Sequence, residues 1–294
     1  MNRHKKIFAL GFFDGVHLGH QALLRECARL AEQENAVPAA ITFDRHPQSL
    51  LTSSAPRLIS TVRDRERLLK QYGMEEIFVL PVTRAVMGTP WQDFLQSLTD
   101  MGGAGFICGD DFRFGDGGQG DGEKLAAFCR ARNLPYTIVP ERTVDDIRVS
   151  STYIRSQIED GDMATAVRFL GHPYLLSGTV VSGKQLGRSI GVPTANLRLP
   201  EGLAMPRFGV YACRALADGA YYPAVTNVGT RPTVDGRGVT VEPWILDYSG
   251  ELYGREITLE FYRFLRPERK FASLEALKAE IHRNAAQTRD ILQP

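Results

Sequence analysis

The chain has 294 residues, of which 43% are hydrophobic and 23% charged, and its formal net charge is +1. A chain of this length can bury the cores of two ordinary domains. The near-neutral charge argues against a general nucleic-acid-binding protein, so we expect small molecules as partners. No apolar stretch approaches the ~20 residues that cross a membrane, so no membrane partner is expected.

The four cysteines are scattered and form no C-x-x-C pair. They supply neither a zinc site nor a disulfide framework, and free thiols indicate a reducing, cytoplasmic location. The apolar start of the chain is interrupted by Asp14 and lacks a small-residue cleavage site. It therefore predicts a first buried strand rather than a signal peptide.

The first half of the chain alternates short apolar runs with helical patterns. Strands are predicted at residues 7–13, 37–43, 77–82, 105–108 and 136–139. Helices are predicted at residues 21–33, 62–72, 91–98, 123–133, 152–159 and 163–170. The alternation predicts a parallel sheet with helices on both faces.

The pattern changes after Gly171-His172-Pro173. From there to about Arg266, β-branched stretches with a period of two alternate with turns rich in glycine and proline. The clearest strands are residues 210–216, 239–246 and 257–264. These features predict an antiparallel barrel. We expect two domains, residues 1–173 and 174–294.

One helix closes the chain. Ser273 is a plausible N-cap, and Leu274, Leu277 and Ile281 form an apolar stripe at helical spacing. We expect this stripe to pack in the core.

The string from Gly11 to His20, Gly-Phe-Phe-Asp-Gly-Val-His-Leu-Gly-His, lies where the first strand should pass into a helix. Such a junction turns backbone N–H groups and a helix N-terminus toward a phosphate. Two imidazoles three residues apart would flank the same point. They suit in-line attack on an α-phosphorus, because donors there stabilise charge on the non-bridging oxygens. Two histidines that only cap the helix or pack are the alternative, and the metalloprotease motif H-E-x-x-H does not match.

The same string resembles the H-x-G-H signature of the nucleotidylyltransferase superfamily. Its flanks resemble the bacterial bifunctional riboflavin kinase/FMN adenylyltransferase family. Three further segments match that family in order: Thr42–Pro47, Gly109–Gly115 and Arg148–Arg155. In the family, Ser, Thr and Arg of the last segment hold ATP phosphates at a second helix start, and Arg155 suits a bidentate phosphate contact.

The resemblance implies a set of residues that bind ATP and its phosphates in the adenylyltransferase domain, with His17 and His20 catalytic. The set is Gly11, Phe13, Asp14, Gly15, His17, His20, Asp111, Arg148, Ser151, Thr152 and Arg155. Phe12 departs from the family pattern, because relatives often have a polar residue at this position. The loop 115–121 lacks a basic residue at Gly118, and it formally matches G-x-G-x-x-G. Its aspartates would repel a pyrophosphate, so we expect a flexible loop.

The string from Gly183 to Leu197 closely resembles the riboflavin kinase signature, whose family forms a six-stranded antiparallel barrel with a glycine-rich loop over ATP. Its glycines permit close backbone approach to phosphates. Thr194 and Asn196 offer neutral oxygens that suit a Mg²⁺ ion already carrying phosphate oxygens and water. A plain barrel turn rich in glycine and proline is the alternative.

In relatives the glutamate of a V-E-x-x-x-x-D strand is the catalytic base, and Glu242 matches it. An exposed structural glutamate is the alternative. Pro243 and Trp244 replace the usual residues, and the proline indicates an edge strand or a bulge. The resemblance implies ATP- and flavin-binding residues at Gly183, Gly187, Arg188, Gly191, Pro193, Thr194, Asn196, Asn227 and Arg266.

The sequence therefore predicts an α/β, Rossmann-like nucleotidylyltransferase domain followed by an antiparallel six-stranded β-barrel kinase domain with a terminal helix. Both domains would use ATP and Mg²⁺ to convert riboflavin to FMN and FMN to FAD. Two alternatives remain: a flavokinase whose N-terminal site has decayed, and a non-catalytic flavin-binding regulatory protein. Association into a homo-oligomer is left open.

Overall fold

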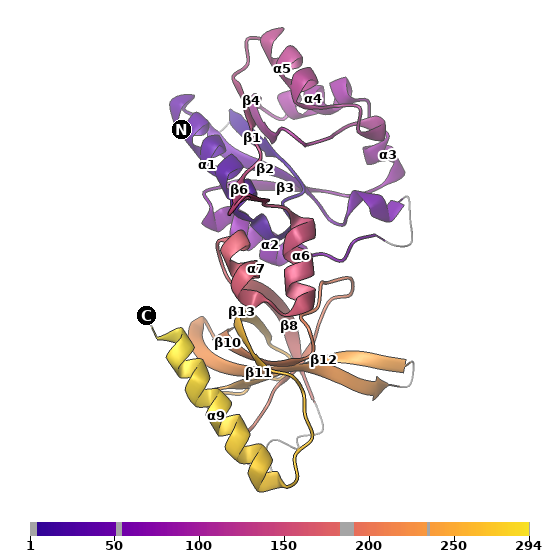
Figure 1. Ribbon diagram of the computed structural model, residues 1–294. Helices are drawn as coiled ribbons and strands as arrows, with labels where there is room; N and C mark the ends of the chain where they lie inside the picture. The colour runs from indigo at the N-terminus through magenta and orange to yellow at the C-terminus, as the bar shows by residue number, and fades with distance from the viewer. Residues whose placement is uncertain (1–4, 51–54, 183–190, 234–235, 294) are drawn as a thin grey trace. The chain divides into compact units, whose positions relative to one another are not determined.

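The computed structural model describes residues 5–50, 55–182, 191–233 and 236–293 (Figure 1). The chain forms two compact units, Met1–Ser151 and Thr152–Pro294. Within the described ranges, no helix is long and apolar enough to span a bilayer.

Five strands form the sheet of the first unit, in the order β3-β2-β1-β4-β5 (Figure 1). They are β1 (Lys6–Leu10), β2 (Val37–Phe43), β3 (Glu76–Leu80), β4 (Gly103–Gly109) and β5 (Tyr136–Val139). All neighbouring pairs run parallel, which confirms the predicted parallel sheet. The order reverses between β1 and β4, and the loops after such strands diverge and leave a crevice at their carboxyl ends.

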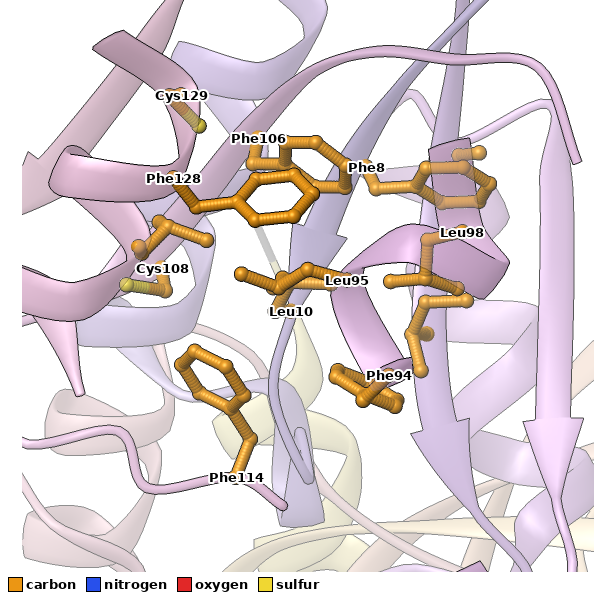
Figure 2. Packing of buried hydrophobic residues seen from close by; sticks show 13 residues of the cluster. Phe8, Leu10, Phe94, Leu95, Leu98, Phe106, Cys108, Phe114, Phe128 and Cys129 are labelled. Carbon is orange, nitrogen blue, oxygen red and sulfur yellow. The ribbon is translucent and has the colours of Figure 1, made fainter. Parts of the chain in front are cut away.

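Helices cover both faces of this sheet, as predicted. They are α1 (Leu18–Gln33), α2 (Val62–Gln71), α3 (Arg84–Met87), α4 (Trp91–Asp100) and α5 (Gly122–Arg130). Phe8 and Phe106 of the sheet pack with Leu95 of α4 and Phe128 of α5 (Figure 2). Because successive strand residues face opposite sides, Ile7 points the other way, where the Cys27 thiol of α1 donates to its carbonyl.

The first strand is shorter than its apolar run predicts. It ends at Leu10, because Phe13 has φ 57° and Gly15 has φ 74°, both in the left-handed region that breaks a strand. A short 3-10 turn, η1 (Asp14–Val16), then connects the strand to α1.

The second unit contains six strands in the order β12-β11-β10-β13-β8-β9, all paired antiparallel. They are β8 (Tyr174–Val181), β9 (Asn196–Arg198), β10 (Gly209–Ala217), β11 (Ala220–Thr233), β12 (Gly236–Ile245) and β13 (Glu256–Arg266). The two end strands approach each other, and the Ala195 N–H donates to the Pro243 carbonyl at 2.9 Å. The sheet is therefore a nearly closed barrel, as predicted, and Pro243 lies on an edge strand.

Among the described residues of the second unit, three helices accompany the barrel: α6 (Ser151–Asp160), α7 (Met163–Leu170) and α9 (Leu274–Leu292). Ser273 caps α9 by accepting from the Ala276 N–H at 3.2 Å, as predicted. Helix α7 packs on β8 and β13, and α9 packs on β10 and β11. The compact second unit thus includes α6 and α7. The boundary at 173/174 stays a prediction.

We expect a fragment beginning at Thr152 to be more stable than one beginning at Tyr174. The shorter fragment lacks Phe169 and Leu170, which are fully buried. Burying side chains of this size is worth about 1.5–3 kcal/mol each, so the midpoint of thermal unfolding should differ by roughly 10 °C. Differential scanning calorimetry of both fragments measures this. Equal midpoints would show that α7 adds nothing to the barrel.

Candidate active sites

The first candidate site lies where β1 passes into α1. His17 is the N-cap of α1, and its Nδ1 accepts from the His20 N–H at 3.3 Å. The two imidazoles stack with centroids 3.6 Å apart and planes 12° from parallel. An Nδ1 that accepts carries no proton, so the proton of neutral His17 is on Nε2. The capping role is therefore present, and it leaves Nε2 as the donor atom of His17.

His20 is held neutral by its surroundings. Burial lowers its pKa well below the usual value, and the nearby His17 and Arg65 lower it further. The ring edge also packs against Phe13, with centroids 5.2 Å apart. His20 thus offers a neutral imidazole group at the start of α1, stacked on His17.

Acid should destabilise the first unit through His20. Its pKa in the folded state lies below the unfolded value of about 6.5, so the unfolded chain binds more protons as the pH falls. The free energy of unfolding should therefore decrease as the pH falls below about 6.5. We expect His20→Gln to flatten this dependence, measured by denaturant unfolding between about pH 7.5 and about pH 5. Identical pH profiles for the variant and the wild type would contradict this assignment.

The Asp14 side chain is buried against the segment before α2. Its Oδ1 accepts from the N–H groups of Ile59 at 2.9 Å and Ser60 at 3.0 Å, and from the Ser60 hydroxyl at 3.1 Å. The Gly15 N–H in turn donates to the Ser60 hydroxyl at 2.9 Å. Asp14 thus holds the turn in place through its carboxylate, a contact that the sequence did not reveal.

Glycine is required at the end of β1. A Cβ on Gly11 would lie 2.8 Å from the Phe13 ring, so a larger residue would displace the aromatic that packs on His20. Phe13 and Gly11 therefore shape the floor of the site by packing.

Sequence reasoning missed Arg65, which is fully buried. Its Nη1 donates to the Thr42 hydroxyl at 3.0 Å and to the Phe43 carbonyl at 2.8 Å. Its guanidinium lies 4.4 Å from the centroid of the Phe12 ring. Phe12 is therefore a stacking partner for a buried cation. The available signal was position: Arg65 lies three residues before Leu68, on the buried face of α2.

Asp111 and Arg148 come together beyond the end of β4. Arg148, in the short strand β7 (Ile147–Arg148), places its Nη2 2.5 Å from the Asp111 carboxylate and 2.6 Å from that of Glu141. All three side chains are exposed enough to meet a ligand.

The second predicted phosphate segment opens α6. Ser151 is the first residue of the helix, and its hydroxyl donates to the Asp14 carbonyl at 3.1 Å. Thr152 and Arg155 follow within the first turns. The start of a helix suits an anion.

The loop 115–121 is a compact turn where we expected a flexible loop. Phe114 and Gly120 exchange two backbone hydrogen bonds, at 3.1 and 2.7 Å. Asp121 caps α5 and lies 3.1 Å from Arg113. Arg113 therefore partly compensates the charge of Asp121, so this aspartate would repel a pyrophosphate less than the sequence suggests.

The second candidate site is a cavity of about 890 Å³ in the barrel unit. Four predicted kinase residues line it together: Thr194, Asn227, Glu242 and Arg266. A cavity of this size can enclose a cofactor-sized ligand. The barrel thus brings together residues that are far apart in the sequence: Thr194 and Arg266 are separated by 72 positions.

Strand register orders these residues. Glu242 pairs with Asn227, Asn227 pairs with Val210, and Val210 pairs with Arg266. Neighbouring strands are about 4.8 Å apart, so this row spans about 14 Å along the barrel wall. The hydrogen bond from Ala195 to the Pro243 carbonyl places Thr194 and Asn196 near its Glu242 end.

Gly191, Pro193 and Asn196, which are also predicted kinase residues, are not among the described residues that line the cavity. Gly191 has φ 75°, a conformation that favours glycine, and both it and Pro193 are exposed. Gly183, Gly187 and Arg188 lie outside the described residues.

The apolar stripe of α9 is not core, so that prediction was wrong. Leu274 is 62% exposed, and Leu274, Leu277 and Ile281 all line the cavity. Trp244 and Phe271 line it as well. A stripe that faces a ligand has the same helical period as one that faces a core, so the sequence could not separate the two.

Asp247, the other acid of the V-E-x-x-x-x-D motif, has a different partner. Its carboxylate lies 2.5 and 3.0 Å from two nitrogens of Arg289 on α9, and that ion pair lowers its pKa. Asp247 is mostly exposed and is not among the described residues that line the cavity.

Comparison with known proteins gives matches to both units. The protein-family model of FAD synthetase matches residues 1–153. The protein-family model of riboflavin kinase matches residues 170–292. A protein of Listeria monocytogenes called bifunctional riboflavin kinase/FMN adenylyltransferase is 34% identical over 97% of this chain and 91% of its own length. The chain belongs to this family.

Another member of the bifunctional riboflavin kinase/FMN adenylyltransferase family, from Escherichia coli, is 35% identical over 97% of this chain and 92% of its own. A solved structure from Streptococcus pneumoniae, described as a macrolide-efflux protein, superposes with a TM-score of 0.87 at 30% identity. The superposition covers 99% of this chain and 95% of the Streptococcus pneumoniae chain. The similarity therefore extends over both units.

Proposed function

We infer that this member of the family catalyses two reactions: phosphorylation of riboflavin to FMN, and adenylylation of FMN to FAD with release of pyrophosphate. Its partners are then riboflavin, FMN, FAD and ATP. The matches to both halves support this function. The observation that carries the kinase assignment is that Thr194, Asn227, Glu242 and Arg266 line one and the same cavity.

In the kinase site, Glu242 is proposed as the general base. Its carboxylate would accept the proton of the terminal ribityl hydroxyl while the γ-phosphoryl group transfers to that oxygen. Thr194 and Asn196 would hold Mg²⁺ near this end of the cavity, through neutral oxygens that suit an ion with phosphate ligands. When bound, the ion would neutralise charge on the transferring phosphate.

The rest of the cavity suits the flavin ring. The apolar residues of α9, with Trp244 and Phe271, supply flat and hydrophobic walls. The row from Glu242 to Arg266 then orients riboflavin, with its ribityl end at Glu242 and its ring toward Arg266 and α9.

In the adenylyltransferase site, the FMN phosphate attacks the α-phosphorus of ATP and pyrophosphate leaves. His17, through Nε2, and His20 would donate to the non-bridging oxygens as charge builds there. Gly15 would allow close backbone approach, while Ser151, Thr152 and Arg155 at the start of α6 would hold the leaving phosphates. Asp111 and Arg148 form an exposed ion pair, and both side chains would be available to bind the nucleotide.

The alternatives find no support. A decayed adenylyltransferase site was suggested by Phe12, which instead stacks with Arg65, and by an acidic loop that is partly compensated. Supplying FMN with MgATP separates the two readings: we expect FAD and pyrophosphate, whereas a flavokinase alone would form neither. A cytoplasmic location stays a proposal, supported by four free, buried cysteines.

Thr194→Ala should raise the Mg²⁺ requirement of FMN formation. The variant loses a neutral ligand for the ion, so half-maximal activity should need about tenfold more Mg²⁺, while turnover at saturating Mg²⁺ falls less. Titration of kinase activity against Mg²⁺ measures this. Thr179→Ala, on β8 and away from the described cavity lining, is the matched control. An unchanged Mg²⁺ titration would remove Thr194 from the metal site.

A further inference from the structure

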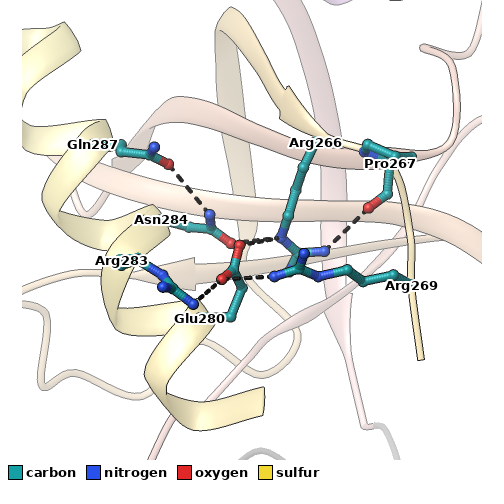
Figure 3. A network of polar contacts seen from close by, with 7 residues as sticks. All are labelled: Arg266, Pro267, Arg269, Glu280, Arg283, Asn284 and Gln287. Carbon is teal, nitrogen blue, oxygen red and sulfur yellow. Dashed lines mark hydrogen bonds and ion pairs between the residues drawn. The ribbon is translucent and has the colours of Figure 1, made fainter. Parts of the chain in front are cut away.

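Glu280 of α9 lies at the centre of a cluster of arginines (Figure 3). The residue is only 8% exposed. Its Oε1 lies 3.3 Å from Nε of Arg266, and its Oε2 lies 2.7 Å from Nη2 of Arg269. The same Oε2 also contacts Arg283. One carboxylate thus serves three guanidinium groups.

Glu280 stands behind the wall of the kinase cavity. Arg266 and Arg269 line the cavity, whereas Glu280 is not among its described lining residues. Arg266 is fixed from further sides, because its Nε donates to Asn284 Oδ1 at 3.0 Å and its Nη1 donates to the Pro267 carbonyl at 3.2 Å. Both guanidiniums also lie over the Phe271 ring, at 5.5 and 4.9 Å from its centroid.

The cluster joins three separate parts of the second unit. Arg266 ends β13, Arg269 lies in the segment that follows, and Glu280 is on α9. Burial lowers the pKa of Arg266, and the Glu280 carboxylate opposes that shift. A buried ion pair adds little net stability, so its better-attested use is to fix geometry. Here the geometry that it fixes is that of two cations on a cavity wall.

Arg266 lies at the end of the strand row opposite Glu242, and Arg269 shares its Glu280 partner and the Phe271 ring there. That is the end where the ring of riboflavin would lie, beside the apolar residues of α9. Guanidinium groups carry only donors, and the polar edge of a flavin ring offers carbonyl oxygens and ring nitrogens as acceptors.

We propose that Glu280 is a positioning residue of the kinase site, which holds Arg266 and Arg269 against the polar edge of the flavin ring. It sets the affinity for flavin and takes no part in phosphoryl transfer. This inference rests on the proposed kinase function, because it takes the cavity to be the riboflavin site.

Glu280→Gln in the full-length chain tests this role, because glutamine keeps the shape and removes the charge. We expect the Kd of riboflavin by calorimetry, and its KM in the kinase assay, to rise about tenfold. The Kd of MgADP and kcat should stay within about twofold of wild type, since both depend on the other end of the cavity. Asp290→Asn removes a carboxylate from an exposed position on the same helix and should change none of these values.

Arg269→Gln removes the ion pair with Glu280 from the other side. The Arg269 side chain is 51% exposed, so this variant should fold even if Glu280→Gln does not. It should raise the KM of riboflavin at unchanged kcat. Unchanged riboflavin affinity in either folded variant overturns the proposal. Weaker MgADP binding with unchanged riboflavin binding also overturns it, because the arginines would then serve phosphates. A wild-type chain that binds MgADP but no riboflavin would remove the proposed function as well.

Discussion

Replacing His17 or His20 by alanine is expected to slow FAD formation from supplied FMN by about 10²–10³-fold, the loss typical of a donor to developing charge. The stacked rings lie at the start of α1, and the contact from the His20 N–H assigns the proton of neutral His17 to Nε2. Riboflavin phosphorylation should continue at the wild-type rate, because its residues belong to the other unit. Parallel assays of FAD from FMN and of FMN from riboflavin measure both effects.

A second substitution separates chemistry from capping at the same residue. Loss of the N-cap in His17→Ala should lower the free energy of unfolding by about 1 kcal/mol. Asparagine is a good N-cap, so His17→Asn should keep that free energy. Both variants should nevertheless lose FAD synthesis, because neither has an imidazole. If His17→Asn retained FAD synthesis, His17 would only cap the helix. Equal loss of both activities in a folded variant would also contradict the assignment.

Replacing Glu242 by glutamine is expected to lower kinase turnover by about 10²–10⁴-fold, the usual contribution of a general base. The glutamine keeps the shape of the side chain in the cavity and removes only its ability to accept a proton. FAD formation from supplied FMN should not change. Steady-state rates at saturating Mg²⁺, riboflavin and ATP measure the loss.

Asp247→Asn is the matched control for Glu242→Gln. Asp247 lies five residues further on and pairs with Arg289 on α9. Its substitution should leave turnover near wild type and cost at most a little stability. If instead Glu242→Gln kept near-wild-type turnover and Asp247→Asn did not, the roles of the two acids would have to be exchanged.

Much of the fold could be predicted from local pattern. The alternation of apolar runs and helical segments gave the parallel sheet, because a strand buried on both faces reads as a continuous apolar run. Pro243 indicated an edge strand, since a proline cannot donate to a second neighbour, and β12 is at the end of the sheet order.

What the pattern missed depends on tertiary contacts. No sequence pattern singled out Arg65 within the helix predicted at residues 62–72, yet it is buried against the end of β2 and the Phe12 ring. The stripe headed by Leu274 looked like core and lines a cavity. For α9, helical spacing correctly identified the side chains that share one face of the helix. What that face meets is decided by residues far away in the sequence.

The most direct test of the two-activity account is a time course of the wild-type chain with riboflavin and MgATP, resolved by chromatography. We expect FMN to appear first and FAD to follow, with one pyrophosphate released for each FAD and none during the first step. FMN that accumulates without FAD would contradict the adenylyltransferase assignment. Riboflavin that remains unchanged, in a protein that forms FAD from added FMN, would contradict the kinase assignment.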